Sequence, residues 1–271
     1  MGLTAMDWGR HRVLVLAPHA DDETFGCGGL IAKVKAEGGA VYVIVASVGD
    51  LHHYGAREEA LEFEPAPLVA GQRAAPSGRE RARGGDGQRR RGLVAGADRA
   101  RELEKAMAVL GVDGYEVLFT DPGTHLRLDA MPRRDLVAYI ERDARYAMDK
   151  VEPTVLVLPE ISYNQDHETL FKVGFTACRP HLPTDKPFVQ IVLSCDAPQL
   201  GWSFQPFHPN FYVDITPYLK TKLRAHACHD SQLKPPPHHA SLENLERLAR
   251  LRGAEVAVEA AEAFRCHRFM A

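Results

Sequence analysis

Short apolar runs alternate with amphipathic stretches from the start of the chain. Residues 13–17 (VLVLA) form an all-apolar run that stops before Pro18, a pattern typical of a parallel strand covered on both faces. Residues 22–37 have helical periodicity and end at a pair of glycines, and residues 41–47 (VYVIVAS) form a second β-branched run. The three segments together predict a right-handed βαβ unit with two parallel strands.

The alternation resumes after residue 98 and continues toward the C-terminus. The periodicity predicts helices over residues 99–110, 133–149, 167–178, 216–227 and 241–252, and strands over 116–119, 154–158, 188–194 and 212–215. Alternating strands and helices predict an α/β fold: a single doubly wound, mostly parallel sheet with helices on both faces, Rossmann-like in layout. No internal repeat or second α/β unit is visible, so we expect one domain over residues 1–271. Gly26, Gly28 and Gly29 lack the dinucleotide-binding spacing and lie within the expected helix.

One segment departs from this pattern. Residues 56 to about 96 consist largely of Ala, Gly, Pro and Arg, and they include RERARGG and QRRRG. Such a segment buries little apolar surface, so we expect a disordered, solvated insert. Two other interpretations stay open: an arginine cluster that binds phosphate or nucleic acid, and an out-of-frame translation of a shorter native loop.

Composition narrows the classes of function. Hydrophobic residues make up 45% and charged residues 25% of the 271, as in ordinary globular proteins, and the net charge of −3 does not favour nucleic acid or an anionic membrane as partner. No run reaches the ~18 apolar residues of a membrane span, and the first ten residues lack the apolar core of a secretion signal. The five scattered cysteines indicate reduced thiols. We therefore expect a cytoplasmic protein without an integral membrane segment; the oligomeric state is not predicted.

Metal-binding side chains gather where the first predicted strand meets its helix. His19 lies just beyond the strand, and Asp21, Asp22 and Glu23 open the helix. Ligand sites of open α/β sheets lie at this carboxyl edge. The acids alone would suit a helix N-terminus, but two adjacent carboxylates beside an imidazole repel each other unless a cation lies between them.

A second cluster follows the strand at residues 154–158. Residues 164–167 (NQDH) lie at the same edge of the predicted sheet. His167 alone would suit a hydrogen-bonded buried histidine. Together with His19 and Asp22 it gives two imidazoles and one carboxylate, the donor set of a catalytic zinc site with one position left for water.

These motifs resemble the PIG-L/LmbE-like family of zinc-dependent N-acetylglucosaminide deacetylases. The resemblance covers nearly the whole chain except residues 56–96, and it rests on residues 13–23 (VLVLAPHADDE), 27–32 (CGGLIA), 49–50 (GD), 100–112 (ARELEKAMAVLGV), 164–167 (NQDH), 222–232 (KLRAHACHDSQ) and 261–264 (AEAF). It implies hydrolysis of the N-acetyl group of an N-acetylated amino sugar or glycoconjugate, a small-molecule substrate.

The resemblance also assigns roles to single residues. His19, Asp22 and His167 would hold Zn²⁺ or another divalent metal, and Asp21 would be the general base toward water. His229 matches the histidine of the family's H-x-[ST]-Q motif, which lies near the same cleft.

Two positions depart from the family pattern. Ala20 replaces a proline that mainly stiffens the turn. Asn164 stands where many members have histidine; an amide donates a hydrogen bond to an oxyanion but cannot transfer a proton. It is therefore open whether Asn164 or His229 acts as the oxyanion donor or as the acid.

The same residues leave three alternative functions open. A zinc-dependent phosphoester hydrolase would use the same activated water. A catalytically inactive sugar-binding relative would keep the fold, and a nucleic-acid module would use the arginines, although these cluster within the insert and not on a folded face.

Overall fold

The main β-sheet of the computed structural model has seven strands, and residues 6–49, 51–52, 93–121 and 123–270 are described. The strands are β1 (Arg12–His19), β2 (Ala40–Ser47), β5 (Gly114–Phe119), β6 (Val155–Pro159), β7 (Ile191–Cys195), β8 (Phe211–Asp214) and β9 (Ala261–Phe269). They lie in the order β5-β2-β1-β6-β7-β9-β8. The first five are parallel, whereas β9 runs antiparallel to β7 and to β8. The mostly parallel α/β sheet predicted from the sequence is confirmed.

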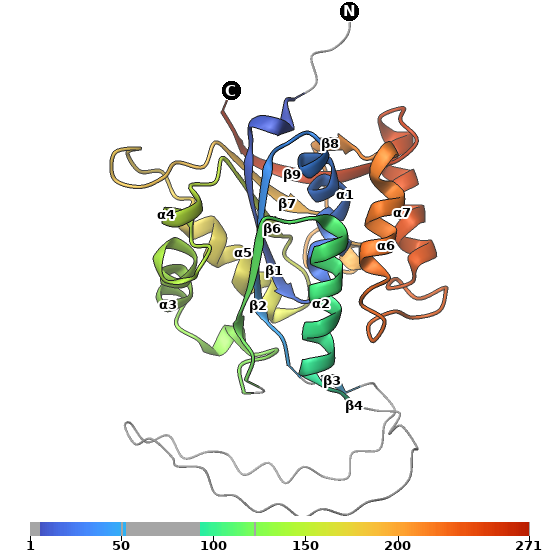
Figure 1. Cartoon of the computed structure of the whole chain (residues 1–271), viewed down its shortest axis with the longest axis horizontal. Helices are drawn as coiled ribbons and strands as arrows, with labels where there is room; N and C mark the ends of the chain where they lie inside the picture. Colours follow the sequence, from blue (N-terminus) through green and yellow to red (C-terminus); the bar gives the residue numbers. More distant parts are fainter. Residues whose placement is uncertain (1–5, 50, 53–92, 122, 271) are drawn as a thin grey trace, which may run out of the picture.

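Helices cover both faces of the sheet. The helices are α1 (Asp22–Ala36), α2 (Gly96–Leu110), α3 (Arg133–Ala138), α4 (Met148–Val151), α5 (Gln165–Ala177), α6 (Leu219–His226) and α7 (Leu242–Glu255). In Figure 1, α1, α2, α6 and α7 lie on one side of the sheet and α3, α4 and α5 on the other.

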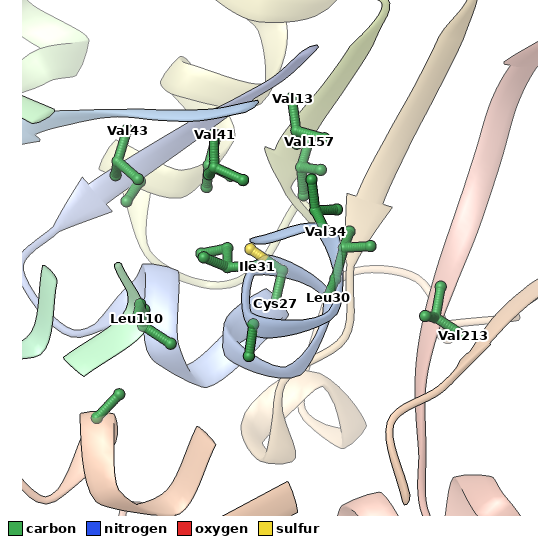
Figure 2. Packing of buried hydrophobic residues seen from close by; sticks show 14 of the residues in the cluster. Val13, Cys27, Leu30, Ile31, Val34, Val41, Val43, Leu110, Val157 and Val213 are labelled. Atoms are coloured by element: carbon green, nitrogen blue, oxygen red, sulfur yellow. The ribbon is translucent and has the colours of Figure 1, made fainter. Parts of the chain in front are cut away.

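Alternate residues of β1 divide the apolar core into two layers. Val13 and Val15 belong to the cluster under α1, and Leu14 and Leu16 belong to the cluster under α5. Figure 2 shows Ile31 of α1 among the valines of the central strands. Because both faces are covered, the central strands are apolar on both sides, which explains their continuous apolar runs.

The structure differs from the predicted elements in three places. The helix expected over residues 133–149 is broken: α3 is followed by a π-helical turn (Tyr139–Asp143), and α4 starts only at Met148. The break occurs where Glu116 of β5 accepts hydrogen bonds from the backbone N–H groups of Arg145 and Tyr146. The helix expected over residues 216–227 starts with a 3-10 turn.

The third difference is β9, which was not predicted as a strand. It lies between β7 and the edge strand β8, yet it contains Glu262, Arg265, His267 and Arg268. These charged and polar residues interrupt the apolar pattern by which buried strands are identified.

The arginine-rich insert predicted over residues 56–96 lies outside the described residues up to position 92. Its last residues are ordered: Leu93–Val94 form β4, which pairs with β3 (Leu51–His52), and α2 begins at Gly96. Among the helices of the described part of the chain, none has the length and apolarity needed to cross a bilayer.

Candidate active site

Three side chains from two strand ends meet at the carboxyl edge of the sheet. His19 ends β1, Asp22 begins α1, and His167 lies in the first turn of α5, after β6. One oxygen, Oδ2 of Asp22, is 3.3 Å from Nδ1 of His19 and 3.4 Å from Nε2 of His167. Their potential ligand atoms all lie within 4.8 Å of one another. Two imidazoles and a carboxylate at this spacing fit a divalent cation of the zinc type.

Asp166 orients the first of these histidines. Its Oδ2 lies 3.0 Å from Nε2 of His19, and its Oδ1 accepts a hydrogen bond of 2.9 Å from the backbone N–H of Leu128. With Nε2 bound to Asp166, Nδ1 of His19 is left facing Asp22, so Asp166 is the carboxylate that fixes the ligand's tautomer. We did not identify Asp166 from the sequence, although it lies within NQDH.

Charge compensation holds the cluster together. Burial favours neutral His19, but hydrogen bonds to Asp166 and Asp22 raise its pKa to about 9. Burial likewise disfavours ionised Asp22, yet His167 and His19 hold its pKa well below the ordinary value. The pocket therefore stabilises a positive charge beside Asp22, which is the requirement for a cation site.

Asp21 lies beside this cluster in a strained conformation. Its φ of 127° is in a region that residues other than glycine rarely adopt. Its backbone N–H donates to Oε2 of Glu23 (3.0 Å), and its carbonyl accepts from the hydroxyl of Thr24 (2.8 Å). Burial and the charge of Asp22 raise the pKa of Asp21 to about 7. A carboxyl group with this pKa exchanges protons near neutrality, as a general base requires.

The structure links His229 to this segment through Glu23. Nε2 of His229 donates to Oε1 of Glu23 over 2.8 Å, and both side chains are fully buried. Burial lowers the pKa of His229, but the carboxylate of Glu23 raises it above the ordinary value. Nδ1 of His229 has no hydrogen-bond partner among the described residues, so it is the ring atom left for another interaction.

Asn164 caps α5 with its side chain. Its Oδ1 accepts a hydrogen bond of 2.9 Å from the backbone N–H of Asp166. This bond uses the acceptor of the amide and leaves Nδ2 as its donor. The cap also fixes the first turn of α5, which carries Asp166 and His167.

A buried arginine, not singled out from the sequence, supports the turn after β1. Arg99 of α2 is 3% exposed and donates to the carbonyls of Ala20 and Gly49 and to Nε2 of His125. The His125 ring packs edge-on against the ring of His19, at 5.3 Å between centroids. Sequence periodicity gave Arg99 only as a helical residue, because its burial depends on the tertiary packing of α2.

Comparison with known proteins identifies the family of this chain. The family model for PIG-L, GlcNAc-PI de-N-acetylase, matches residues 14–178, which is more than half of the chain and includes His19, Asp21, Asp22 and His167. The chain belongs to the PIG-L family. No curated protein matches the sequence.

Three solved structures share the fold of this PIG-L family member. A conserved protein from Thermus thermophilus has 21% identity and a TM-score of 0.62, with 94% of this chain and 93% of that chain covered. The N,N'-diacetylchitobiose deacetylase from Pyrococcus horikoshii has 22% identity and a TM-score of 0.60, with 94% and 83% covered. The 4-carboxy-2-hydroxymuconate hydratase GalB from Pseudomonas putida has 17% identity and a TM-score of 0.62, with 96% and 98% covered.

The C-terminal motifs of this PIG-L chain lie against α1. Lys222 and Glu262 form a buried ion pair with 2.5 Å between Nζ and Oε1. Glu262 also accepts hydrogen bonds from the backbone N–H groups of Gly29 and Leu30, just after α1 kinks at Cys27. The carboxylate thus caps the second half of the kinked helix. This role accounts for the AEAF and KLRAH motifs outside the matched segment.

A cavity at the carboxyl edge of the sheet adjoins the cluster. Asp22, Glu23 and His167 line one part of it, and the ends of β6 and β7 contribute Glu160, Asp196, Gln199 and Leu200. The pocket therefore combines two residues of the His19–Asp22–His167 cluster with further polar side chains able to bind a polar substrate.

Proposed function

We propose that this PIG-L family member is a zinc-dependent N-deacetylase that hydrolyses the acetamide of an N-acetylated amino sugar or glycoconjugate. The observation that supports it most is the convergence of His19, Asp22 and His167, with Asp21 beside them. Zinc held by these three residues supplies a Lewis acid that polarises the acetamide carbonyl and acidifies water.

The residues of the chain have separate tasks in this proposal. Asp21 accepts a proton from the attacking water and returns it to the leaving nitrogen, so that the C–N bond breaks and acetate and a free amine form. Asn164 donates from Nδ2, or His229 from its ring, to the developing oxyanion. Asp166 keeps His19 in the tautomer that leaves Nδ1 facing Asp22, where His19 would help to hold the metal.

A sugar substrate is supported by two further observations. The family takes its description from GlcNAc-PI de-N-acetylase, an enzyme named for an N-acetylated sugar substrate. The Pyrococcus horikoshii protein is named as a deacetylase that acts on N,N'-diacetylchitobiose, a disaccharide. The GalB hydratase has the same fold, so the fold does not decide the reaction; the family and the site residues favour deacetylation.

The cysteines support a reducing compartment, and we propose the cytoplasm. All five are free thiols, and Cys27 and Cys178 are buried.

Free-amine release from a panel of N-acetylglucosaminides tests the proposed function. The panel includes the monosaccharide, N,N'-diacetylchitobiose and an inositol-linked glucosaminide, each with and without a chelator. We expect amine and acetate in equal amounts, loss of both with chelator, and recovery on addition of Zn²⁺. Turnover of a phosphomonoester or of 4-carboxy-2-hydroxymuconate, with no release of amine from any acetamide, would overturn the proposal.

A further inference from the structure

Two aromatic side chains form an exposed pair beside the candidate active site. The rings of Tyr163 and Trp202 lie 5.9 Å apart between centroids at an angle of 39°, and the residues are 52% and 82% exposed. Tyr163 follows β6 and Trp202 follows β7, so both belong to the carboxyl edge of the sheet. The hydroxyl of Ser203 donates to the carbonyl of Ile161 over 2.8 Å, which ties the two segments together.

The pair lies next to residues that form the cavity. Tyr163 directly precedes Asn164, the N-cap of α5, whose first turn carries His167. Trp202 follows the 3-10 turn Pro198–Gly201, and Gln199 and Leu200 of that turn line the cavity together with Asp22 and His167. The backbone N–H of Trp202 donates to the carbonyl of Gln199 over 3.0 Å, so the pair lies one hydrogen bond away from a residue of the cavity lining.

The aromatic pair and the polar cavity together fit a carbohydrate. Exposed patches of large aromatic side chains often mark ligand-binding sites, because it is unfavourable to leave such apolar surface in water. The C–H-bearing face of a pyranose ring packs on an aromatic face while its hydroxyl groups stay in reach of acceptors. Glu160 and Asp196 supply carboxylate acceptors in the cavity. Both are held in place within the protein, Glu160 by the hydroxyl of Ser194 and Asp196 by the guanidinium of Arg252.

The geometry also limits how a sugar packs. A ring inserted between Tyr163 and Trp202 would need about 7 Å, twice the ~3.5 Å spacing of van der Waals contact. The observed 5.9 Å is too short, so the sugar packs on an outer face, and Trp202 is the more exposed of the two.

We infer that the Tyr163–Trp202 pair is a subsite for a second pyranose ring, glycosidically linked to the sugar whose acetamide lies at the His19–Asp22–His167 cluster. This inference rests on the proposed function and specifies its substrate: an N-acetylated disaccharide or longer glycan is preferred to the monosaccharide.

Kinetics with two substrates test the subsite. The measured quantity is the ratio of kcat/KM for N,N'-diacetylchitobiose to that for N-acetylglucosamine. Trp202→Ala lowers this ratio roughly 3- to 10-fold, the loss expected for one stacking contact. Trp202→Phe restores most of it. Phe204→Ala removes another exposed aromatic of the same loop, 74% exposed, and leaves the ratio at the wild-type value. An unchanged ratio in Trp202→Ala overturns the subsite. A third substrate, an alkyl N-acetylglucosaminide, carries an apolar group in place of the second sugar; if Trp202→Ala lowers kcat/KM only for this substrate, the subsite is also overturned.

Fluorescence tests the same contact without catalysis. The chain has two tryptophans, and Trp8 is 3% exposed, so Trp8→Phe leaves Trp202 as the single reporter. We expect N,N'-diacetylchitobiose to shift the emission of Trp202 to shorter wavelength in a saturable way, at concentrations where N-acetylglucosamine has no effect. The absence of a shift overturns the subsite even if amine release is observed. A shift without amine release supports the subsite and contradicts the deacetylase reaction, so the two failures are distinguishable.

Discussion

Glu23 and His229 are 206 residues apart in the chain, yet Oε1 of Glu23 accepts a 2.8 Å hydrogen bond from Nε2 of His229 in the interior of the protein. The other oxygen of the same carboxylate accepts the backbone N–H of Asp21. One buried side chain thus fixes both the strained residue proposed as the base and the histidine of the C-terminal motif. Glu23 is a positioning residue in this account.

Glu23→Gln should reduce kcat strongly while zinc stays bound. An amide has one acceptor oxygen, so it cannot accept from Asp21 and from the Nε2–H of His229 at the same time. We expect a loss of roughly 100-fold, the lower end of the range for a misplaced acid–base group. Amine release and zinc content are measured on the same samples. Glu102→Gln is the matched control, because Glu102 binds Ser231 of the same HDSQ motif from outside the site. Equal effects of the two substitutions would show that Glu23 only stabilises the motif.

Asp166→Asn should weaken metal binding. The substitution keeps the size of the side chain but removes the charge that fixes His19, and loss of such a partner typically lowers affinity roughly 10- to 100-fold. Competition with a chromophoric chelator measures the zinc affinity. Asp129→Asn, at an exposed position of the neighbouring 3-10 turn, serves as control. An unchanged affinity in Asp166→Asn would contradict its role.

Glu262→Gln should destabilise the fold. The substitution leaves the ammonium group of Lys222, 3% exposed, without its carboxylate partner. Breaking a buried pair in this way typically costs about 3–5 kcal/mol in the free energy of unfolding. Urea denaturation measures it. Glu243→Gln breaks an exposed pair with Arg247 and should change the free energy by less than ~0.5 kcal/mol. A loss as small as that of the control would show that the buried pair contributes little.

His226 should make the fold sensitive to acid. Burial, followed by the charges of His229 and Lys222, lowers its pKa to about 3, from 6.5 for an ordinary histidine. In the unfolded chain this residue therefore binds a proton below about pH 6.5, whereas in the folded chain it stays neutral down to about pH 3. Stability falls as the pH decreases through this window, by up to about 1.4 kcal/mol per pH unit.

Unfolding free energies at pH 4, 5 and 6 test this effect. The decrease between pH 6 and pH 4 should be smaller in His226→Gln than in the wild type, whatever the absolute stability of the variant. Equal slopes would mean that carboxylates alone account for the acid sensitivity.

The sequence predicted that His19, Asp22 and His167 lie together because its signals are local. A strand end followed by a helix start places His19 and Asp22 on one turn, and parallel strands bring His167 to the same edge of the sheet. These inferences need only the direction of each strand and no knowledge of its neighbours.

The supporting residues depend on packing that periodicity does not report. Arg99 has the appearance of a helical surface residue, and its burial follows from the position of α2 against the turn after β1. Glu262 interrupts the apolar pattern of β9, and its value as a cap depends on the kink in α1. Asp166 is adjacent to His167, but only the three-dimensional arrangement shows that it binds His19.

The central claim is that Asp21 acts as the base beside a metal that it does not hold. Zinc content and amine release from N,N'-diacetylchitobiose, measured together in the wild type and in Asp21→Asn, test this claim most directly. The account predicts one zinc per chain in both proteins and a loss of turnover of roughly 10²- to 10⁴-fold in the variant. Near-normal turnover in Asp21→Asn, or full wild-type activity without metal, would contradict it.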